Sequence, residues 1–347
     1  MGKDALPGAV VRKRRRLRTL IITVFTVLGL FAVGSGAQLI AERVDMSRFP
    51  PPGELVDVGG GRLMHFDVRG KGNLGPTIVL EAGGTLTSSV WAWVQARLAT
   101  DATVVSYDRA NMGWSDPVDR PADALAVAAD LHAGLNALHL HGPYLLVGHS
   151  IGGYYVQEFA TAYPRDVAGL VLLDPSPGGW MTGLPPKMVA SIQSQQGQTG
   201  LLRLATFFGI TRLYNPLATI VDGLPEPARS AMLASTTNSN NLIGVDRDSA
   251  MFEQLGAASA AFRDLGSLPV RIVSAGVSDD PAYASWQDAQ WAMHKKMLGM
   301  SSDAVQVKML KANHISLLTQ RDNADAVADV ILALHTVLAT RYPASSE

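Results

Sequence analysis

The chain has 347 residues, of which 47% are hydrophobic and 17% charged, so it can bury a sizeable core and is neither fibrous nor disordered. Residues 1–18 hold seven Lys/Arg and one Asp, so the formal net charge of −1 leaves the remaining chain acidic, which argues against nucleic acid as a partner. Because the chain has no cysteine, it cannot depend on disulfides or thiolate chemistry, and we expect neither a cofactor nor a metal.

The N-terminus carries a basic cluster, residues 12–18, followed directly by an uncharged apolar run that reaches Ile40. A helix of about 20 mostly apolar residues crosses a bilayer, and the positive-inside rule keeps the basic end in the cytoplasm. We therefore expect residues 1–40 to be a membrane anchor, with the folded part outside the cytoplasm. The alternative is a cleaved signal peptide and a secreted or periplasmic protein, since Ser35-Gly36-Ala37 resembles a small-residue cleavage site.

Residues 41–53 end in three prolines and a glycine, which predicts a stiff linker because consecutive prolines cannot continue a helix. The folded body is then expected to begin near Glu54. Its first segments, 55–58 and 63–68, flank three consecutive glycines and predict an antiparallel hairpin at the edge of a sheet.

Short apolar runs rich in β-branched residues alternate with segments of helical length in the rest of the body. Such runs are typical of buried parallel strands, and their alternation with helices predicts a wound, mostly parallel α/β sheet. The predicted strands lie at residues 77–80, 103–107, 144–147, 169–173, 270–274 and 305–309. The helices predicted from apolar spacing lie at 122–138, 151–163 and 323–340.

The alternation is interrupted between residues 176 and 266, a stretch rich in Leu, Ala and Met without a strand pattern. We interpret residues 176–266 as a helical cap inserted into the sheet domain. The core would then comprise residues 54–175 and 267–347.

The pentapeptide Gly148-His149-Ser150-Ile151-Gly152 matches G-x-S-x-G, the nucleophile elbow. The match gains weight from its context, because a predicted strand precedes it and a predicted helix follows it. This context predicts that Ser150 is a nucleophile on a sharp turn and that the Ile151 amide points at a developing oxyanion.

A serine hydroxyl needs a base to remove its proton during attack. His314 follows the last predicted strand and precedes the C-terminal helix, which suits the chain order of serine, acid and histidine. His149 is less suitable, because it cannot easily turn back onto the hydroxyl of its neighbour. His314 is therefore the predicted base.

Three aspartates compete for the role of the acid that orients His314. Asp279 and Asp280 follow the strand predicted at 270–274, at the carboxyl end where sites of this architecture assemble. Asp174 also ends a predicted strand, although its position before Pro175 suits a turn residue at the start of the cap.

A second oxyanion donor is expected from the loop after the strand at 77–80. Two glycines there, Gly83 and Gly84, let the backbone approach a substrate carbonyl closely, and we favour the Gly84 amide over that of Gly83.

Taken in order, these motifs resemble those of the α/β-hydrolase superfamily, in its branch with a helical cap, over residues 54–340. The resemblance implies the fold and a triad but not the substrate. It also selects Asp279 as the acid, since relatives place the carboxylate three residues after a glycine such as Gly276; Asp280 ranks second and Asp174 third. The segments that carry it are Glu81-Ala-Gly-Gly84, Tyr107–Asp116, Gly148–Gly152, Gly169–Asp174, Gly276–Asp280 and His314.

Several positions depart from relatives or narrow the chemistry. Ser150 stands where haloalkane dehalogenases and epoxide hydrolases carry Asp, which argues against alkyl-enzyme chemistry. Ile151 replaces the Trp common in proline iminopeptidases, which argues against a peptidase, and Asn111 replaces a common glycine. Asp108 and Arg109 are expected to be structural, because their spacing to Ser150 suggests no catalytic task.

The leading hypothesis is a serine hydrolase that cleaves a small or medium apolar carboxylic ester, or a lactone, through an acyl-enzyme intermediate. An acyltransferase or a cofactor-free haloperoxidase or perhydrolase on the same triad is the alternative. A third hypothesis is a binding protein that keeps the fold without activity.

Overall fold

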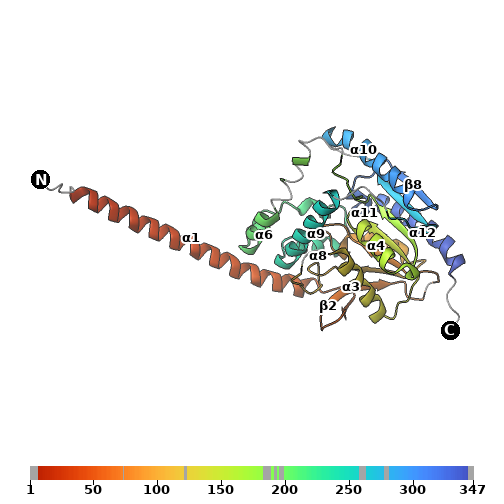
Figure 1. Ribbon diagram of the computed structural model, residues 1–347. Helices are drawn as coiled ribbons and strands as arrows, with labels where there is room; N and C mark the ends of the chain where they lie inside the picture. Colours follow the sequence, from red (N-terminus) through yellow and green to blue (C-terminus); the bar gives the residue numbers. More distant parts are fainter. Residues whose placement is uncertain are drawn as a thin grey trace.

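The computed structural model describes residues 7–342 apart from 73, 121–122, 183–188, 191–193, 195–198, 258–262 and 277–280. Figure 1 shows a layered body of helices and strands from which one long N-terminal helix extends.

The body is built on an eight-stranded sheet with the order β1-β2-β4-β3-β5-β6-β7-β8. β1 and β2 form the predicted antiparallel hairpin at one edge, and β2 also pairs with β4 in antiparallel fashion. All the other neighbours are parallel, which confirms the predicted mostly parallel sheet. The strands are β1 (Glu54–Asp57), β2 (Leu63–Arg69), β3 (Ile78–Glu81), β4 (Val104–Tyr107), β5 (Tyr144–His149), β6 (Val167–Leu173), β7 (Val270–Ala275) and β8 (Ala304–Met309).

Helices cover both faces of this sheet, as continuous buried strands such as β3 and β6 require. One core cluster joins the sheet to α2 (Ala92–Leu98), α11 (Ser316–Thr319) and α12 (Arg321–Arg341). The other joins it to α3 (Ala124–Ala137), α4 (Gly152–Ala162) and the end of α10 (Pro281–Met297). The buried aliphatic side chains of the central strands thus hold the two helical layers in place.

The regular elements among the described residues between β6 and β7 are all helices, joined by turns and irregular segments. They are α6 (Thr199–Phe207), α7 (Ile210–Leu213), α8 (Ala228–Ser235) and α9 (Ser239–Ala257), together with a 3₁₀ turn at Ala218–Val221. Because β6 leaves the sheet at its carboxyl end, these helices lie over the edge at which the parallel strands end.

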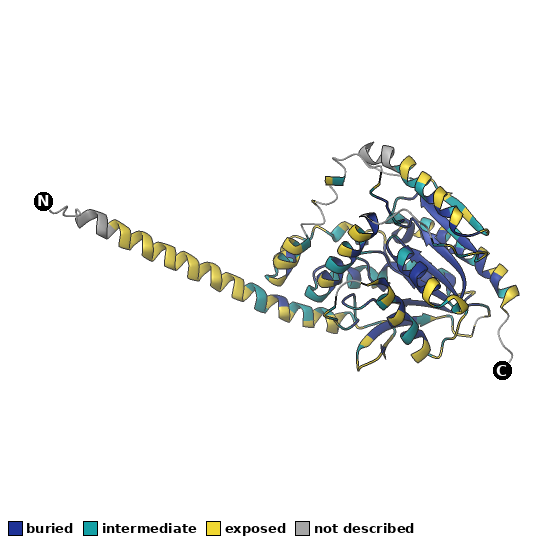
Figure 2. Cartoon of the chain, viewed as in Figure 1, coloured by how far each residue is buried: buried dark blue, intermediate teal, exposed yellow. Residues whose placement is uncertain are grey.

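The N-terminal helix, α1 (Pro7–Arg48), is a single element of 42 residues. Figure 2 shows its first part exposed and its last part in contact with the body; residues 12–33 are all exposed. Two described helices, α1 and α12, are long and apolar enough to cross a membrane, but α12 packs in the core.

The linker predicted at 41–53 is wrong for most of its length, because α1 continues through Arg48 and only residues 49–53 connect it to β1. Residues 41–48 contain no proline or glycine, so nothing ends the helix before Pro50.

Polar contacts with the cap hold this last part of α1. The buried Gln38 side chain donates to the Thr237 carbonyl at 2.7 Å, and the Arg212 guanidinium bridges Gln38 at 2.7 Å and the Asp45 carboxylate at 2.8 Å. Residues from Gln38 onward therefore belong to the folded body.

Two truncations test this division of α1. Removal of residues 1–33 should leave the melting temperature of the body nearly unchanged, because residues 12–33 are exposed. Removal of residues 1–48 should lower it by about 2–6 °C, because Arg212 and the Ser239 amide, which donates to Glu42, lose their acceptors. Equal melting temperatures, measured by calorimetry in the same detergent, would contradict the assignment.

Candidate active site

Ser150 occupies the sharp turn between β5 and α4. Its φ of 55° lies in the left-handed region, and its amide donates to the Leu173 carbonyl at 3.0 Å. The flanking glycines are required by close packing, since a Cβ at Gly148 would lie 2.5 Å from the Gly152 carbonyl oxygen and one at Gly152 would lie 2.6 Å from the Ala82 carbonyl oxygen. The structure thus gives each glycine of the G-x-S-x-G pattern a steric reason.

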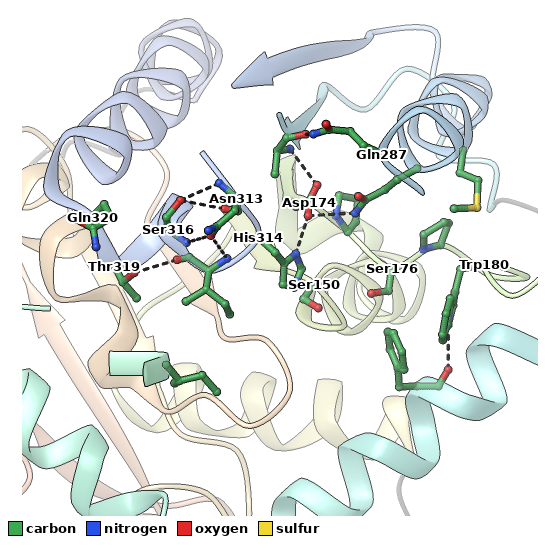
Figure 3. Close-up of a pocket in the computed structure, with 18 of the residues that line it drawn as sticks. Ser150, Asp174, Ser176, Trp180, Gln287, Asn313, His314, Ser316, Thr319 and Gln320 are labelled. Carbon is green, nitrogen blue, oxygen red and sulfur yellow. Dashed lines mark hydrogen bonds and ion pairs between the residues drawn. The ribbon is translucent and has the colours of Figure 1, made fainter. Parts of the chain in front are cut away.

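His314 lies on the loop after β8, beside Ser150 in Figure 3, and both residues line the same cavity. Its Nδ1 is 2.6 Å from an Asp174 carboxylate oxygen, so the imidazole N–H donates to the acid. The His314 side chain is 42% exposed whereas that of Asp174 is 1% exposed. The acid is therefore buried behind an imidazole that reaches the cavity.

The surroundings of Asp174 stabilise its ionised form. Its carboxylate also accepts from the Ala275 amide at 3.0 Å and from the Gln290 amide group at 3.1 Å. Burial raises the pKa of Asp174, but the hydrogen bond and charge of His314 outweigh it, and the pKa falls to about 2. A carboxylate at neutral pH can hold the imidazole and stabilise its positive charge.

The acid that lies beside His314 is therefore Asp174, which ranked third. The choice of Asp279, which ranked first, stays a prediction. Asp279 and Asp280 lie outside the described residues. The physical reason is that β6 and β7 are neighbours, so their carboxyl ends reach the same edge of the sheet. Asp174 follows β6 directly, and its positive φ of 44° belongs to a turn at that edge.

His149, discounted as a base, contacts the His314 loop. It is fully buried, and its Nε2–H donates to the His314 carbonyl at 2.9 Å. Burial, followed by the nearby charge of His314, lowers the pKa of His149 to about 3, so its imidazole is neutral at ordinary pH. His149 is thus a positioning residue for the base.

The two glycines after β3 lie in different surroundings. A Cβ at Gly83 would lie 2.7 Å from His149 Nδ1 and 3.2 Å from Ser150 Cβ, whereas one at Gly84 would meet no atom closer than 3.6 Å. Gly84 lines a cavity together with Ser150 and Ile151, so the two residues expected to supply the oxyanion donors border the same cavity as Ser150.

Arg109 ties this glycine loop to the cap, a link that the sequence spacing did not reveal. Its guanidinium donates to the carbonyls of Ala82 at 2.7 Å and Gly83 at 2.9 Å, and it pairs with the Glu81 carboxylate. It also pairs with Asp248 of α9 at 2.7 Å. The expected structural role of Arg109 therefore includes holding the loop beside Ser150.

Two cavities meet at Ser150. One, of about 830 Å³, contains His314 and polar side chains such as Gln287, Asn313 and Gln320. The other, of about 660 Å³, lies beneath the cap; its apolar lining comes from Leu201, Leu202, Ala205, Leu217, Val245 and Phe252. Among the described residues, no group of three or more His, Asp or Glu side chains is placed to hold a metal ion.

Substitution of the two glycines should have unequal effects. Gly83→Ala should reduce turnover at least about a hundredfold, because the new methyl group displaces His149 or the nucleophile, and displacements near 1 Å have such effects. Gly84→Ala should stay within a few-fold of the native rate, because its methyl group makes only ordinary contacts. Similar turnover in both variants would refute the packing account.

The buried Arg109–Asp248 pair predicts a difference between two neighbouring acids of α9. Asp248→Asn should lower the free energy of unfolding by about 2–4 kcal/mol, since it removes one of the two carboxylates that pair with a buried guanidinium. Asp246→Asn, which affects a pair with the exposed Arg203, should lower it by less than about 1 kcal/mol. Urea unfolding measures both, and equal losses would contradict the network.

Comparison with known proteins agrees with this architecture. A family model described as the alpha/beta hydrolase family matches residues 78–330. The match covers more than half of the chain, so the protein belongs to the alpha/beta hydrolase family. The family establishes a hydrolase fold and leaves its substrate open.

Individual relatives share only part of the chain. The uncharacterized protein YqjL of Bacillus subtilis (strain 168) is 35% identical over 108 residues, which are 31% of this chain and 43% of that protein. The uncharacterized protein Rv2715 of Mycobacterium tuberculosis (strain ATCC 25618 / H37Rv) is 30% identical over 205 residues, 54% of this chain and 58% of that protein. The chain thus spans less than two thirds of these relatives.

Solved structures share the fold over most of the chain. The epoxide hydrolase CorEH has a TM-score of 0.61 at 19% identity and covers 82% of this chain and 98% of its own. The enol-lactonase from Burkholderia xenovorans LB400 has a TM-score of 0.56 at 16% identity and covers 81% and 99%. At these identities the likeness concerns the fold alone.

Proposed function

We propose that the protein hydrolyses a carboxylic ester or lactone with Ser150 as nucleophile, His314 as base and Asp174 as acid. The observation that carries the proposal is the 2.6 Å bond from His314 to a buried carboxylate, in a cavity that also contains Ser150 on its strained turn. Serine, acid and base follow one another along the chain in the order of the family.

The reaction runs in two halves. Ser150 Oγ attacks the carbonyl carbon while His314 takes its proton, and the oxyanion is met by the amides of Ile151 and Gly84. The imidazolium then gives the proton to the leaving alkoxide, which departs as an alcohol. Water attacks the acyl-enzyme with His314 again as base, and the carboxylic acid leaves with Ser150 restored.

The two cavities suit the two halves of an ester. The leaving oxygen must lie near His314, which protonates it, so the alcohol portion belongs in the more polar cavity beside that residue. The acyl portion belongs in the apolar cavity with Ile151, Gly84 and the cap side chains. This division favours substrates with an apolar acyl group.

The exposed apolar part of α1 is proposed to anchor the enzyme in a membrane. It carries the basic cluster on its far end, so the positive-inside rule leaves the body outside the cytoplasm. Cleavage of the segment as a signal peptide is the alternative outcome, and N-terminal sequencing of the mature protein distinguishes the two.

Exchange of the acid provides the main test. Asp174→Asn should fold normally and lower turnover of nitrophenyl esters by about three to four powers of ten, because an amide cannot stabilise the imidazolium. Ser150→Ala should be at least as inactive, and Asp303→Asn, at an acid of the Arg271 surface pair, should be unaffected.

The same assay separates the rival assignments. Normal turnover in Asp174→Asn with none in Asp279→Asn would return the role of acid to Asp279. Turnover that survives in Ser150→Ala would overturn the proposal. Product analysis with added alcohol or peroxide distinguishes hydrolysis, which gives free acid, from acyl transfer or perhydrolysis.

A further inference from the structure

An apolar face on the cap has no partner within the described part of the chain. It belongs to α6, α7 and the residue that follows α7, and Figure 2 shows exposed residues along α6. Six large hydrophobic side chains there are between 47% and 90% exposed, which is unusual for so short a stretch. They are Leu201, Leu204, Phe207, Ile210, Leu213 and Tyr214.

This face stands next to the apolar part of α1. The rings of Phe31 and Phe208 are 4.2 Å apart, and a Cβ at Gly34 would lie 2.4 Å from the Phe208 carbonyl oxygen. In Figure 1, α6 is the labelled helix of the body beside the middle of α1. The cap therefore meets α1 within its apolar run, before that run ends.

The length of α1 that is free of the body is too short to cross a bilayer alone. Between Arg18 and Phe31 lie the residues Thr19–Leu30, which span about 18 Å at 1.5 Å per residue. The hydrocarbon core is about 30 Å thick. If α1 crosses it, the last 10 Å or so of the crossing lie at the level of α6.

Both arginines of α6 and α7 are paired with acids of other helices. Arg203 on α6 pairs with Asp246 of α9 at 2.8 Å, and Arg212 on α7 pairs with Asp45 of α1. The exposed side chains between these arginines are apolar, which is the pattern of an interfacial helix rather than that of a solvated surface.

The apolar cavity at Ser150 lies directly beneath α6. Leu201, Leu202 and Ala205 line it on one side, and Ser150 lines it on the other. Leu201 is also part of the exposed face, so the same helix separates the cavity from the outside.

We propose that the α6–α7 face lies in the bilayer that holds α1, and that the cavity beneath it takes the acyl chain of a lipid ester from that bilayer. The inference rests on the proposed anchor and on the proposed ester hydrolysis. It replaces a small soluble ester by a membrane lipid as the substrate class, because an enzyme whose acyl cavity lies beneath a membrane-facing helix meets apolar chains there at high concentration.

The first experiment measures the depth of the face in a membrane. The chain has no cysteine, so each single substitution by cysteine introduces one thiol, and a thiol-reactive spin label attaches at that position alone. Labels at Leu204→Cys and Phe207→Cys are compared with Phe25→Cys in α1 and with Leu74→Cys, an exposed control before β3 at the amino end of the sheet, in full-length protein in phosphatidylcholine vesicles.

Collisions with oxygen, which enters hydrocarbon, and with a nickel chelate, which stays in water, give the result. Spin labels at positions 204, 207 and 25 should collide more often with oxygen than with the nickel chelate. The label at position 74 should collide more often with the nickel chelate. Nickel access at 204 and 207 with lipid contact at 25 would overturn the proposal while the anchor stands. Low access to both reagents at 204 and 207 would mean a protein partner, such as a second copy, and would also overturn it. Nickel access at 25 would overturn the anchor as well.

The second experiment measures the substrate class. The double variant Leu204→Glu/Phe207→Glu should hydrolyse a long-chain diacyl lipid in vesicles at least tenfold more slowly than the native enzyme. Its turnover of a water-soluble butyrate ester should stay within about twofold, since neither residue lines the cavity. Leu74→Glu should change neither rate.

Two outcomes separate the proposals. Equal rates of native enzyme and double variant on the vesicle lipid would overturn the lipid assignment, even where butyrate is hydrolysed. If the native enzyme cleaves neither ester, the proposed hydrolysis itself fails, and the spin labels still decide whether α6 lies in the bilayer.

Discussion

The left-handed backbone at Ser150 is the constraint on which the remaining site depends. A serine at φ 55° is stable only if the chain on both sides is held firmly, and here β5 lies between β3 and β6 while α4 packs on the sheet. Glycines at 148 and 152 allow the close approach that the turn needs. The same turn places the Ile151 amide at the start of α4, so the proposed nucleophile and the proposed oxyanion donor come from one turn.

Two buried charged side chains, Asp174 and Arg109, hold the loops around this turn in place. Asp174 holds His314 from behind, and His149 holds the backbone of the same loop. Arg109 holds the glycine loop and reaches Asp248 in α9. Movement of α9 away from Arg109 would break a buried ion pair, which costs free energy of folding. A displacement of the cap is therefore expected to move the loop beside Ser150 as well.

Much of this could be read from the sequence. Apolar periodicity located the eight strands, and the pattern around Ser150, with His314 after the last strand, selected two members of the proposed triad. The acid could not be chosen, because β6 and β7 end side by side and only coordinates show which carboxylate meets the imidazole. The Arg109–Asp248 pair joins residues 139 apart in sequence, which no local pattern reveals. The continuation of α1 to Arg48 could have been predicted, because residues 41–48 contain no proline or glycine.

Covalent labelling tests the central claim most directly. A fluorophosphonate probe phosphonylates a serine that a neighbouring base activates, and peptide mass spectrometry identifies the modified residue. The account predicts one adduct, on the peptide that contains Ser150, formed far more slowly when His314 is replaced by Ala. An adduct at another serine, or no adduct in folded native protein, would contradict it.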